Sequence, residues 1–184
     1  MKKIFNQPQI IGSEQVMEFI QHSNFIEGEY SSQAFDDAMK AWRYAFKDAK
    51  KGKLDLDYVL VIHRELQKHL RPDIAGEVRH CDVWIGGQRK MYISDSLIKD
   101  QIKQVISKIN AHVDCPTNND SDNERICKAY HIEFEGIHPF EDGNGRVGRI
   151  LLNVHRISVG LPILIIHEGA EQMKYYEWFR ETQP

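Results

Sequence analysis

Apolar residues recur at intervals of three and four along most of the chain, which is the spacing of helices that bury one face. This spacing predicts seven helices, over residues 13–25, 31–47, 55–70, 94–112, 125–137, 145–159 and 169–180. Ser13, and either Ser31 or Ser32, are suited to cap the first two of these helices. We therefore expect a mainly α protein, built as a bundle of about seven helices.

Residues 81–94 form the one stretch with a convincing β pattern. Residues 83–85 (VWI) and 91–93 (MYI) are rich in β-branched and aromatic side chains, and a Gly-Gly pair lies between them. Two such runs around a glycine pair predict a β-hairpin. Because an isolated hairpin is only marginally stable in water, it must pack on the helices or on a ligand.

Composition narrows the class of protein. The 184 residues, 41% of them hydrophobic, suffice for one core, so we expect a single domain over residues 1–184. The formal net charge of −3 gives no basic footprint for nucleic acid, and no apolar run is long enough for a membrane span. Cys81, Cys115 and Cys127 lack CxxC spacing and are interpreted as free thiols. Together with the absence of a signal-peptide core, this predicts a cytoplasmic protein that binds neither nucleic acid nor membranes.

Residues 138–149 (HPFEDGNGRVGR) combine features that suit a polyphosphate. Gly143, Asn144 and Gly145 tolerate positive φ, and the backbone N–H groups of such a turn form an anion-binding concavity. A helix beginning near Gly145 adds its free amides and the positive end of its dipole. Arg146 and Arg149 are three residues apart, so both guanidinium groups can face one side of that helix and bind phosphate oxygens.

Two further residues of this stretch indicate chemistry. Asp142 offers hard oxygen ligands where Mg²⁺ on a polyphosphate would lie. His138 has the ordinary pKa that suits a general base near neutral pH. Each feature alone is common in turns and on solvated helix faces, but their coincidence within twelve residues favours a nucleotide site with a metal ion and a base.

The same stretch resembles the signature of the Fic family, HxFx(D/E)GNGRxxR, and every fixed position is filled. The resemblance implies a Fic-type helix bundle and a protein adenylyltransferase that moves AMP from ATP to a hydroxyl of a target protein. It implies that His138 is the base, that Asp142 holds Mg²⁺, and that Gly143 to Arg149 bind the phosphates. It also implies that such an enzyme modifies itself.

The segment Ser23-Asn24-Phe25-Ile26-Glu27-Gly28 has two interpretations. From the residues alone it is a helix that ends at Gly28. It also resembles the family's inhibitory motif, (S/T)xxxE(G/N), which implies that residues 13–28 form an inhibitory helix. In such proteins the glutamate, here Glu27, pairs with the second arginine of the signature, here Arg149.

The family resemblance extends to both sides of the predicted site. It implies that the hairpin over residues 81–94 is the flap on which the target docks as an added strand, with Met91 and Tyr92 beside the nucleotide. Tyr175 and Tyr176 resemble a tyrosine pair near the adenosine. The family often has an asparagine beyond this pair, and here Gln183 lies near that position.

Other activities stay open at this stage. Members of the family transfer other nucleotides, phosphocholine or phosphate, and some remove AMP. A metal-dependent hydrolase is a second class, because His131, Glu135 and His138 are spaced i, i+4 and i+7 and could hold a metal ion. A binding module without catalysis is a third, although the intact His138 argues against it.

Overall fold

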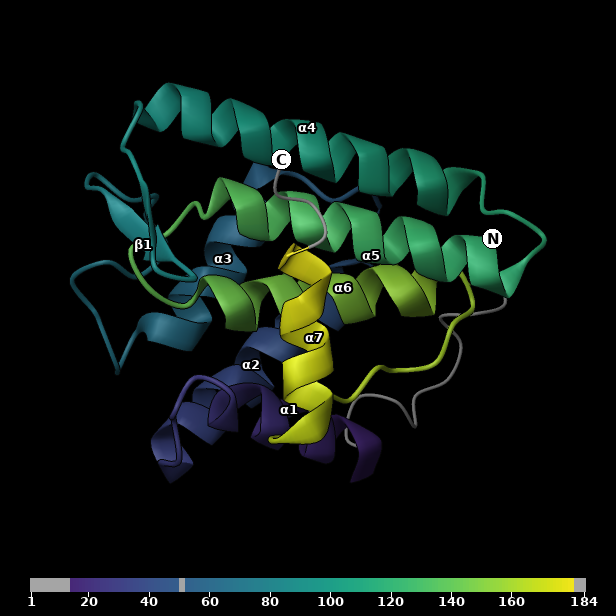
Figure 1. The fold of residues 1–184 in the computed structure, drawn as a ribbon, viewed down its shortest axis with the longest axis horizontal. Helices are drawn as coiled ribbons and strands as arrows, with labels where there is room; N and C mark the ends of the chain where they lie inside the picture. The colour runs from purple at the N-terminus through teal and green to yellow at the C-terminus, as the bar shows by residue number, and fades with distance from the viewer. Residues whose placement is uncertain (1–13, 50–51, 181–184) are drawn as a thin grey trace.

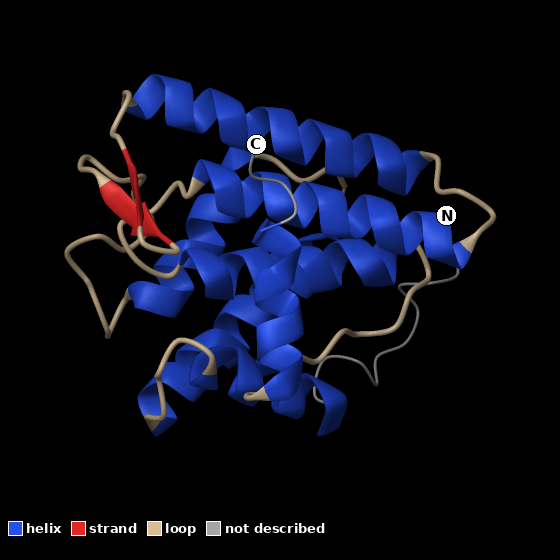
Figure 2. Ribbon diagram, viewed as in Figure 1, coloured by secondary structure: helices blue, strands red, loops and turns tan. Residues whose placement is uncertain are grey.

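The computed structural model describes residues 14–49 and 52–180, which form seven helices and one two-stranded hairpin (Figures 1 and 2). The helices are α1 (Glu14–Phe25), α2 (Ser32–Ala49), α3 (Leu56–Gln67), α4 (Asp95–Asp114), α5 (Asp120–Ile137), α6 (Asn144–Ser158) and α7 (Ala170–Arg180). The predicted mainly α bundle with one hairpin is confirmed. The predicted caps Ser13 and Ser31 differ in outcome: Ser31 Oγ accepts the Ala34 N–H at 3.1 Å, whereas Ser13 lies outside the described residues.

The largest departure from the predicted elements is at the start of α5. The helix begins at Asp120 rather than at residue 125, and Asn119 caps it by accepting the Ser121 N–H. Its first turn carries polar residues, so it shows no apolar periodicity. The buried Asn123 belongs to this turn, and its Oδ1 accepts the Thr117 N–H at 3.0 Å. Helix α3, in turn, ends at Gln67 rather than at residue 70.

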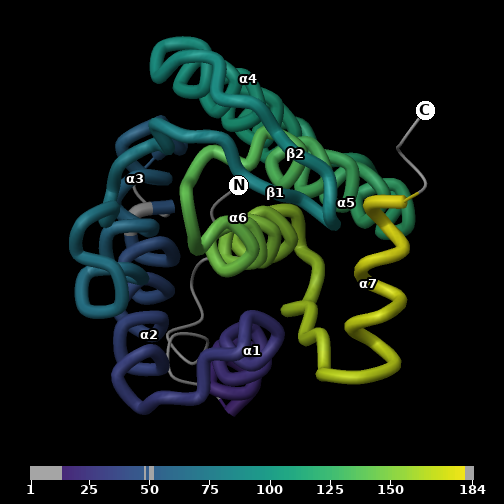
Figure 3. The backbone as a smooth tube through the Cα atoms, turned by 60° about the vertical axis from the view of Figure 1, so that its left-hand side comes forward, coloured from purple at the N-terminus to yellow at the C-terminus, as the bar shows by residue number. Residues whose placement is uncertain are grey.

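Helix α6 is the centre of the bundle, with the other helices arranged around it (Figure 3). It packs against α1, α2, α3, α4 and α5. Val147, Ile150 and Val154 belong to the main hydrophobic core, yet Arg146 and Arg149 on the same helix are also buried. A buried charge is costly unless it is paired, so these two arginines require partners from the protein or from a ligand.

The hairpin projects beside the start of α6 (Figures 1 and 3). Strands β1 (Val83–Ile85) and β2 (Gln88–Lys90) pair antiparallel, with Trp84 opposite Arg89. Gly86 and Gly87 both have positive φ, at 55° and 85°, as a tight two-residue hairpin turn requires. The predicted hairpin is thus confirmed, but its second strand is Gln88–Lys90 rather than the expected residues 91–93, because the two-residue turn at Gly86-Gly87 starts the pairing at once.

Helix α7 is joined to the bundle far more loosely than α6. Tyr175 is its only buried residue, and it shares a small cluster with Ile26 and Ile166. Trp178 and Phe179 pack on this cluster from outside. None of the helices in the described part of the chain has the length and apolar character needed to cross a membrane.

Candidate active site

The loop between α5 and α6 is held rigid by its own side chains. Asn144 is buried, and its amide closes the loop by accepting the Phe140 N–H at 2.8 Å and donating to the Phe140 carbonyl at 2.9 Å. The Phe140 ring is fully buried and stacks on His63, with ring centroids 3.8 Å apart. Of the three residues expected to use positive φ, only Gly143 does so, at 82°, because Asn144 and Gly145 already belong to the helix.

The start of α6 offers unused hydrogen-bond donors. Gly143 is the N-cap and has no side chain to satisfy the first amides of the helix. Arg146 is 2% exposed, and its Nε and Nη1 atoms have no hydrogen-bond partner among the described residues. Buried donors without partners are rare in folded proteins and need an explanation. An anion at this helix end would provide their acceptors.

Asp142 lies at the edge of the same loop, with half of its side chain exposed. Its Oδ1 accepts the Gly143 N–H at 2.7 Å, and its Oδ2 accepts a hydrogen bond from Gln67 Nε2 at 3.1 Å. The Arg146 Nη2 atom is 3.7 Å from Oδ2. The carboxylate is therefore oriented by neighbours while its open side faces solvent, which is the arrangement a metal ligand needs.

His138 ends α5 in the left-handed conformation, with φ of 50°. Its Nδ1 lies 3.3 Å from the Glu135 carbonyl oxygen, which can only accept, so Nδ1 carries the proton and Nε2 keeps its lone pair. Burial lowers the pKa of His138 below its ordinary value of 6.5, with the Glu135 carbonyl acting in the opposite sense. The ring is thus neutral near pH 7 and can accept a proton.

Glu27 and Arg149 are brought together although they are far apart in the sequence. Arg149 Nη2 donates to Glu27 Oε1 at 2.7 Å and to the Ser23 carbonyl at 2.8 Å, while its Nε donates to Ser23 Oγ at 2.9 Å. The Glu27 carboxylate lies directly on the first turn of α6, where a side chain on Gly145 would collide with Oε1. A carboxylate oxygen therefore occupies the positive end of the helix.

A cavity of about 580 Å³ lies between the hairpin, the start of α6 and α7. Its lining includes His138, Gly145, Arg149, Tyr175 and Tyr176, so part of the expected phosphate side and the expected adenosine side face one space. The other residues expected at the phosphates or the metal ion are not among the lining residues: Asp142, Gly143, Asn144 and Arg146. This volume is within the usual range for small-molecule sites.

The hairpin contributes other residues to this cavity than expected. Trp84, Ile85 and Gly86 line it, whereas Met91 is 65% exposed and, like Tyr92, is not among the lining residues. The Tyr92 hydroxyl donates to Asp95 Oδ1 at 2.6 Å. Gln183 lies outside the described residues.

The sequence did not predict two residues at the nucleotide site, although one of them, Glu135, was considered as a ligand of the alternative metal site. Glu135 lines the cavity, and its Oε1 is buried without a hydrogen-bond partner in the described structure. Burial raises the pKa of Glu135 to about 8, with Arg149 opposing and Glu27 reinforcing the shift. A side chain on Gly148 would collide with this carboxyl group, so the glycine inside the signature marks the space that Glu135 fills.

Arg79 is the second residue that pattern analysis missed. It is 2% exposed, and it donates from Nε to the His138 carbonyl at 2.9 Å and from Nη2 to the Met91 carbonyl at 3.2 Å. Its backbone N–H donates to the Pro139 carbonyl at 2.8 Å. One buried guanidinium therefore joins the end of the hairpin to the loop between α5 and α6. No local pattern could identify it, because its partners are backbone carbonyls distant in sequence.

The alternative metal site at His131, Glu135 and His138 is not assembled. His131 Nε2 is hydrogen bonded to the Tyr175 hydroxyl at 2.9 Å. Among the residues that the structure describes, these three do not form a group whose ligand atoms converge. The structure therefore does not support a metal site built from these three residues.

Two curated proteins that are similar to this chain are both named protein adenylyltransferases. Protein adenylyltransferase Fic from Aedes aegypti is 29% identical over 132 residues, which are 71% of this chain and 25% of that protein. Protein adenylyltransferase fic-1 from Caenorhabditis elegans is also 29% identical, over 131 residues, again 71% of this chain and 25% of that protein. The aligned region thus spans about a quarter of the length of these curated relatives.

Solved structures share the fold. Fic-1 from Caenorhabditis elegans aligns with a TM-score of 0.68 at 20% identity, covering 96% of this chain and 60% of that one. A Fic domain containing signaling protein from Bacteroides thetaiotaomicron gives 0.69 at 18% identity, covering 96% and 77%. The model of the Fic/DOC family matches residues 53–155, which include the loop, His138 and both signature arginines. Because this match covers more than half of the chain, the protein belongs to the Fic/DOC family.

Proposed function

We propose that the protein is an adenylyltransferase that moves AMP from ATP to a hydroxyl side chain of a protein. The observation that carries this proposal is that two groups without partners lie at the two ends of one loop. Arg146, at the start of α6, has two buried donors without acceptors among the described residues, and His138, at the end of α5, lines the cavity with its Nδ1 held by the Glu135 carbonyl. The first group suits a phosphate and the second suits the proton of an attacking hydroxyl. The names of the curated relatives support the same activity.

In this mechanism His138 Nε2 takes the proton of the target hydroxyl as its oxygen attacks the α-phosphorus. The new O–P bond forms while the bond to the β-phosphate breaks, and pyrophosphate leaves. The first amides of α6 and the Arg146 guanidinium stabilise the charge that develops on phosphate oxygens. One such donor is typically worth roughly 3–4 kcal/mol of transition-state stabilisation.

The residues present also fit a magnesium ion. Asp142 offers a half-exposed carboxylate that Gln67 and the Gly143 N–H hold in place. Mg²⁺ in proteins is commonly held by one or two carboxylates together with substrate phosphates. When bound, the ion would neutralise charge on the triphosphate. The contribution of the chain itself is to orient Asp142 and to keep Arg146 beside it.

Autoinhibition by Glu27 belongs to the same proposal. Its carboxylate already occupies the Arg149 guanidinium and the first turn of α6. A γ-phosphate needs those same donors, so ATP would bind with its triphosphate displaced. A misplacement of about 1 Å at the reacting atoms can cost roughly 10²-fold in rate. The closed arrangement of Ser23, Glu27 and Arg149 is therefore assigned to the inactive state.

Target docking on the hairpin completes the proposal. Trp84 is 67% exposed in the middle of strand β1 and also lines the cavity. A target segment that pairs with the outer edge of the hairpin would bring a hydroxyl toward His138. The same geometry allows another copy of the protein to be modified.

The test is a transfer assay with α-³²P-labelled ATP, with GTP, CTP and UTP in parallel. Wild type should be nearly inactive, and Glu27→Gly should modify itself about 100-fold faster. The double variant Glu27→Gly/His138→Ala should lose about 10²–10⁴-fold of that rate. It should still bind an ATP analogue, as calorimetry would show.

Glu29→Gly is the matched control, since it removes an equally acidic residue that has no contact with Arg149 in the described structure. If both glycine variants gave the same rate, charge alone would explain the effect and the inhibitory assignment would be wrong. Full activity in the Glu27→Gly/His138→Ala variant would show that His138 is not the general base. Transfer of another nucleotide in preference to ATP would correct the substrate.

A further inference from the structure

A cluster of possible metal ligands lies where α1 meets the segment leading into α7. Glu18 and His22 are one helical turn apart on α1 and share a face. His167 approaches from the other side, with Nε2 3.0 Å from Glu18 Oε1. One ligand atom from each of the three residues lies within 4.8 Å of the other two. The His22 and His167 rings have centroids only 4.4 Å apart.

The hydrogen bonding of this cluster is incomplete. His22 Nδ1 is shielded from solvent and has no hydrogen-bond partner within the described chain. Such a group loses its hydration without compensation, which is unfavourable. A shielded imidazole nitrogen without a hydrogen-bond partner, in a cluster with a second imidazole and a carboxylate, is a group that a metal ion can bind.

The residue behind His167 has the position of an orienting carboxylate. Glu171 Oε2 accepts the His167 Nδ1–H at 2.6 Å and the His167 backbone N–H at 3.0 Å. This arrangement holds the ring by Nδ1 and turns Nε2 toward Glu18, and a metal ion bound there would take the place of the Nε2 proton that Glu18 Oε1 accepts. Histidines that bind metals almost always donate their other ring N–H to a carboxylate or carbonyl in this way.

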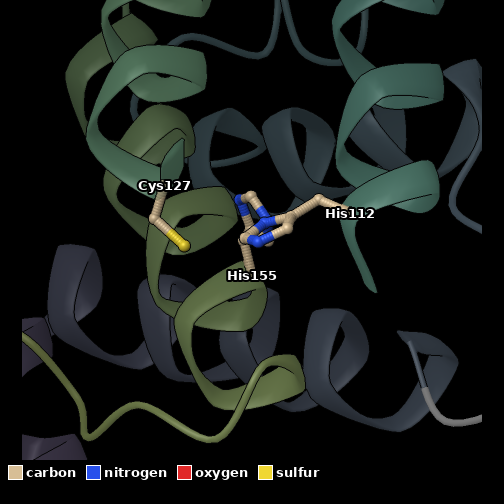
Figure 4. Close-up of side chains that lie close together, drawn as sticks. All are labelled: His112, Cys127 and His155. Atoms are coloured by element: carbon tan, nitrogen blue, oxygen red, sulfur yellow. The ribbon is translucent and has the colours of Figure 1, made fainter. Parts of the chain in front are cut away.

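The described residues contain one other group of this kind, and it is complete without an ion. His112, Cys127 and His155 converge from α4, α5 and α6 in the core (Figure 4). His112 Nδ1 is 2.8 Å from His155 Nε2, and its Nε2 is 3.0 Å from Asn123 Oδ1. The Cys127 thiol is buried in an apolar cluster, and burial raises its pKa to about 12. A thiol that resists ionisation is a poor ligand.

We propose that Glu18, His22 and His167 bind one Zn²⁺ ion, which ties α1 to the segment before α7. Two imidazoles and a carboxylate are a common donor set for zinc, with a fourth position left to water. All three side chains are partly exposed, so an ion can enter from solvent. The ion replaces the weak polar contacts between two elements that otherwise share only the small Ile26–Ile166–Tyr175 cluster.

The zinc site lies next to the residues of the proposed autoinhibition. An effect of zinc on activity therefore rests on that proposed function. His22 immediately precedes Ser23, whose hydroxyl and carbonyl hold Arg149. Glu27 follows one turn later. We call the contacts of Ser23 and Glu27 with Arg149 the latch. An ion that fixes His22 against His167 keeps Ser23 and Glu27 on Arg149, so zinc stabilises the closed latch.

Binding is tested first, with Zn²⁺ alone and a chromophoric chelator as competitor. Wild type should bind one ion per chain, and thermal unfolding should shift upward with zinc. His167→Ala and the more conservative Glu18→Gln should each weaken binding more than about tenfold. Cys127→Ala and the exposed-thiol variant Cys115→Ser should bind as wild type does.

No zinc binding by wild type would overturn the site, as would undiminished binding in both Glu18→Gln and His167→Ala. Loss of binding in the Cys127 variant alone would place the ion in the core instead. Glu18→Gln keeps a hydrogen bond to His167, so a folded protein that no longer binds zinc separates metal binding from simple ion pairing.

The link to the latch is tested by transfer assays with and without Zn²⁺. Zinc should lower the residual rate of wild type several-fold and leave Glu27→Gly unchanged. Equal inhibition of both would show that zinc acts at the nucleotide site, and no inhibition of wild type would show an uncoupled ion; either result overturns the link. If no variant transferred AMP, the proposed function would fail while the binding result still stood.

Discussion

The two sides of the active-site cavity are built in opposite ways. On the phosphate side, α6 is buried on every face and the loop before it is fixed by Asn144 and by Phe140 stacked on His63. On the other side, α7 has one buried residue. This helix and the segment before it are held by the small Ile26–Ile166–Tyr175 cluster and by the ion pair between His167 and Glu18 of α1. Under the proposed function, the core would position the reacting groups, and contacts that can be released would control access to them.

This difference fits the work that each side would do. Groups that stabilise a transition state must be held in place before the reaction, because reorganising them costs free energy at the barrier. A latch must instead open at a cost that a cell can supply, and elements with few buried contacts open most easily. The Arg149 guanidinium belongs to the first side and its partner Glu27 to the second, so the switch lies at their boundary.

The largest contrast should appear in stability. Phe140→Ala removes a fully buried ring that stacks on His63, and we expect it to lower the free energy of unfolding by about 3–5 kcal/mol. Tyr176→Ala, on the exposed face of α7, should change it by no more than about 0.5 kcal/mol. Urea unfolding of both variants measures the difference. Similar losses would mean that the two sides are equally part of the core.

Glu135 should make the stability depend on pH. The folded protein holds its proton up to a pH of about 8, whereas the ordinary pKa of the group is 4.5. The folded state therefore binds more protons between these values, so its stability falls as the pH rises through this window. Glu135→Gln should abolish this fall, and by pH 8 it should be more stable than wild type by roughly 2–4 kcal/mol. Equal free energies of unfolding for wild type at pH 5 and pH 8 would contradict this.

Substitution of Asp142, the proposed metal ligand, should affect nucleotide binding rather than folding. Asp142→Ala should weaken Mg²⁺-dependent binding of an ATP analogue by about 10–100-fold, and Gln67→Ala should weaken it less, because Gln67 only orients the carboxylate. Glu141→Ala is the control, being the adjacent acid, which pairs with Arg71 instead. Calorimetry with and without Mg²⁺ measures each. An equal effect at residue 141 would point to general charge rather than to metal ligation.

The smallest expected effect concerns Ser23. Its hydroxyl accepts one hydrogen bond from the Arg149 Nε, so Ser23→Ala weakens the latch while Glu27 and the Ser23 backbone carbonyl still hold it. A hydrogen bond to a charged group is worth about 1.5 kcal/mol at the lower end of its range, which corresponds to roughly tenfold. Automodification should therefore rise about tenfold, less than in Glu27→Gly. No change would mean that the carboxylate alone sets the latch.

Local patterns were sufficient for the elements and for much of the site. Helical periodicity identified all seven helices, since each buries an apolar face, and the Gly-Gly pair identified the hairpin because both residues have positive φ. The first turn of α5 escaped detection because its polar residues face solvent or bond to the preceding loop. The signature stretch made His138, Asp142 and both arginines candidates for the site, because their spacing is itself a property of one loop and one helix.

What the sequence by itself determined was therefore the set of groups within each segment. Only the tertiary structure decided that Arg79 meets the His138 and Met91 carbonyls and that Glu18 meets His167. The contact of Glu27 with Arg149 was expected from the family resemblance, but no local pattern of the residues required it. The tertiary structure also decided that Trp84, rather than Met91, lines the cavity, and that the Asn144 side chain supports the loop. The physical reason is that pKa values, burial and unsatisfied donors depend on neighbours that the fold brings from elsewhere in the chain, and no local pattern records them.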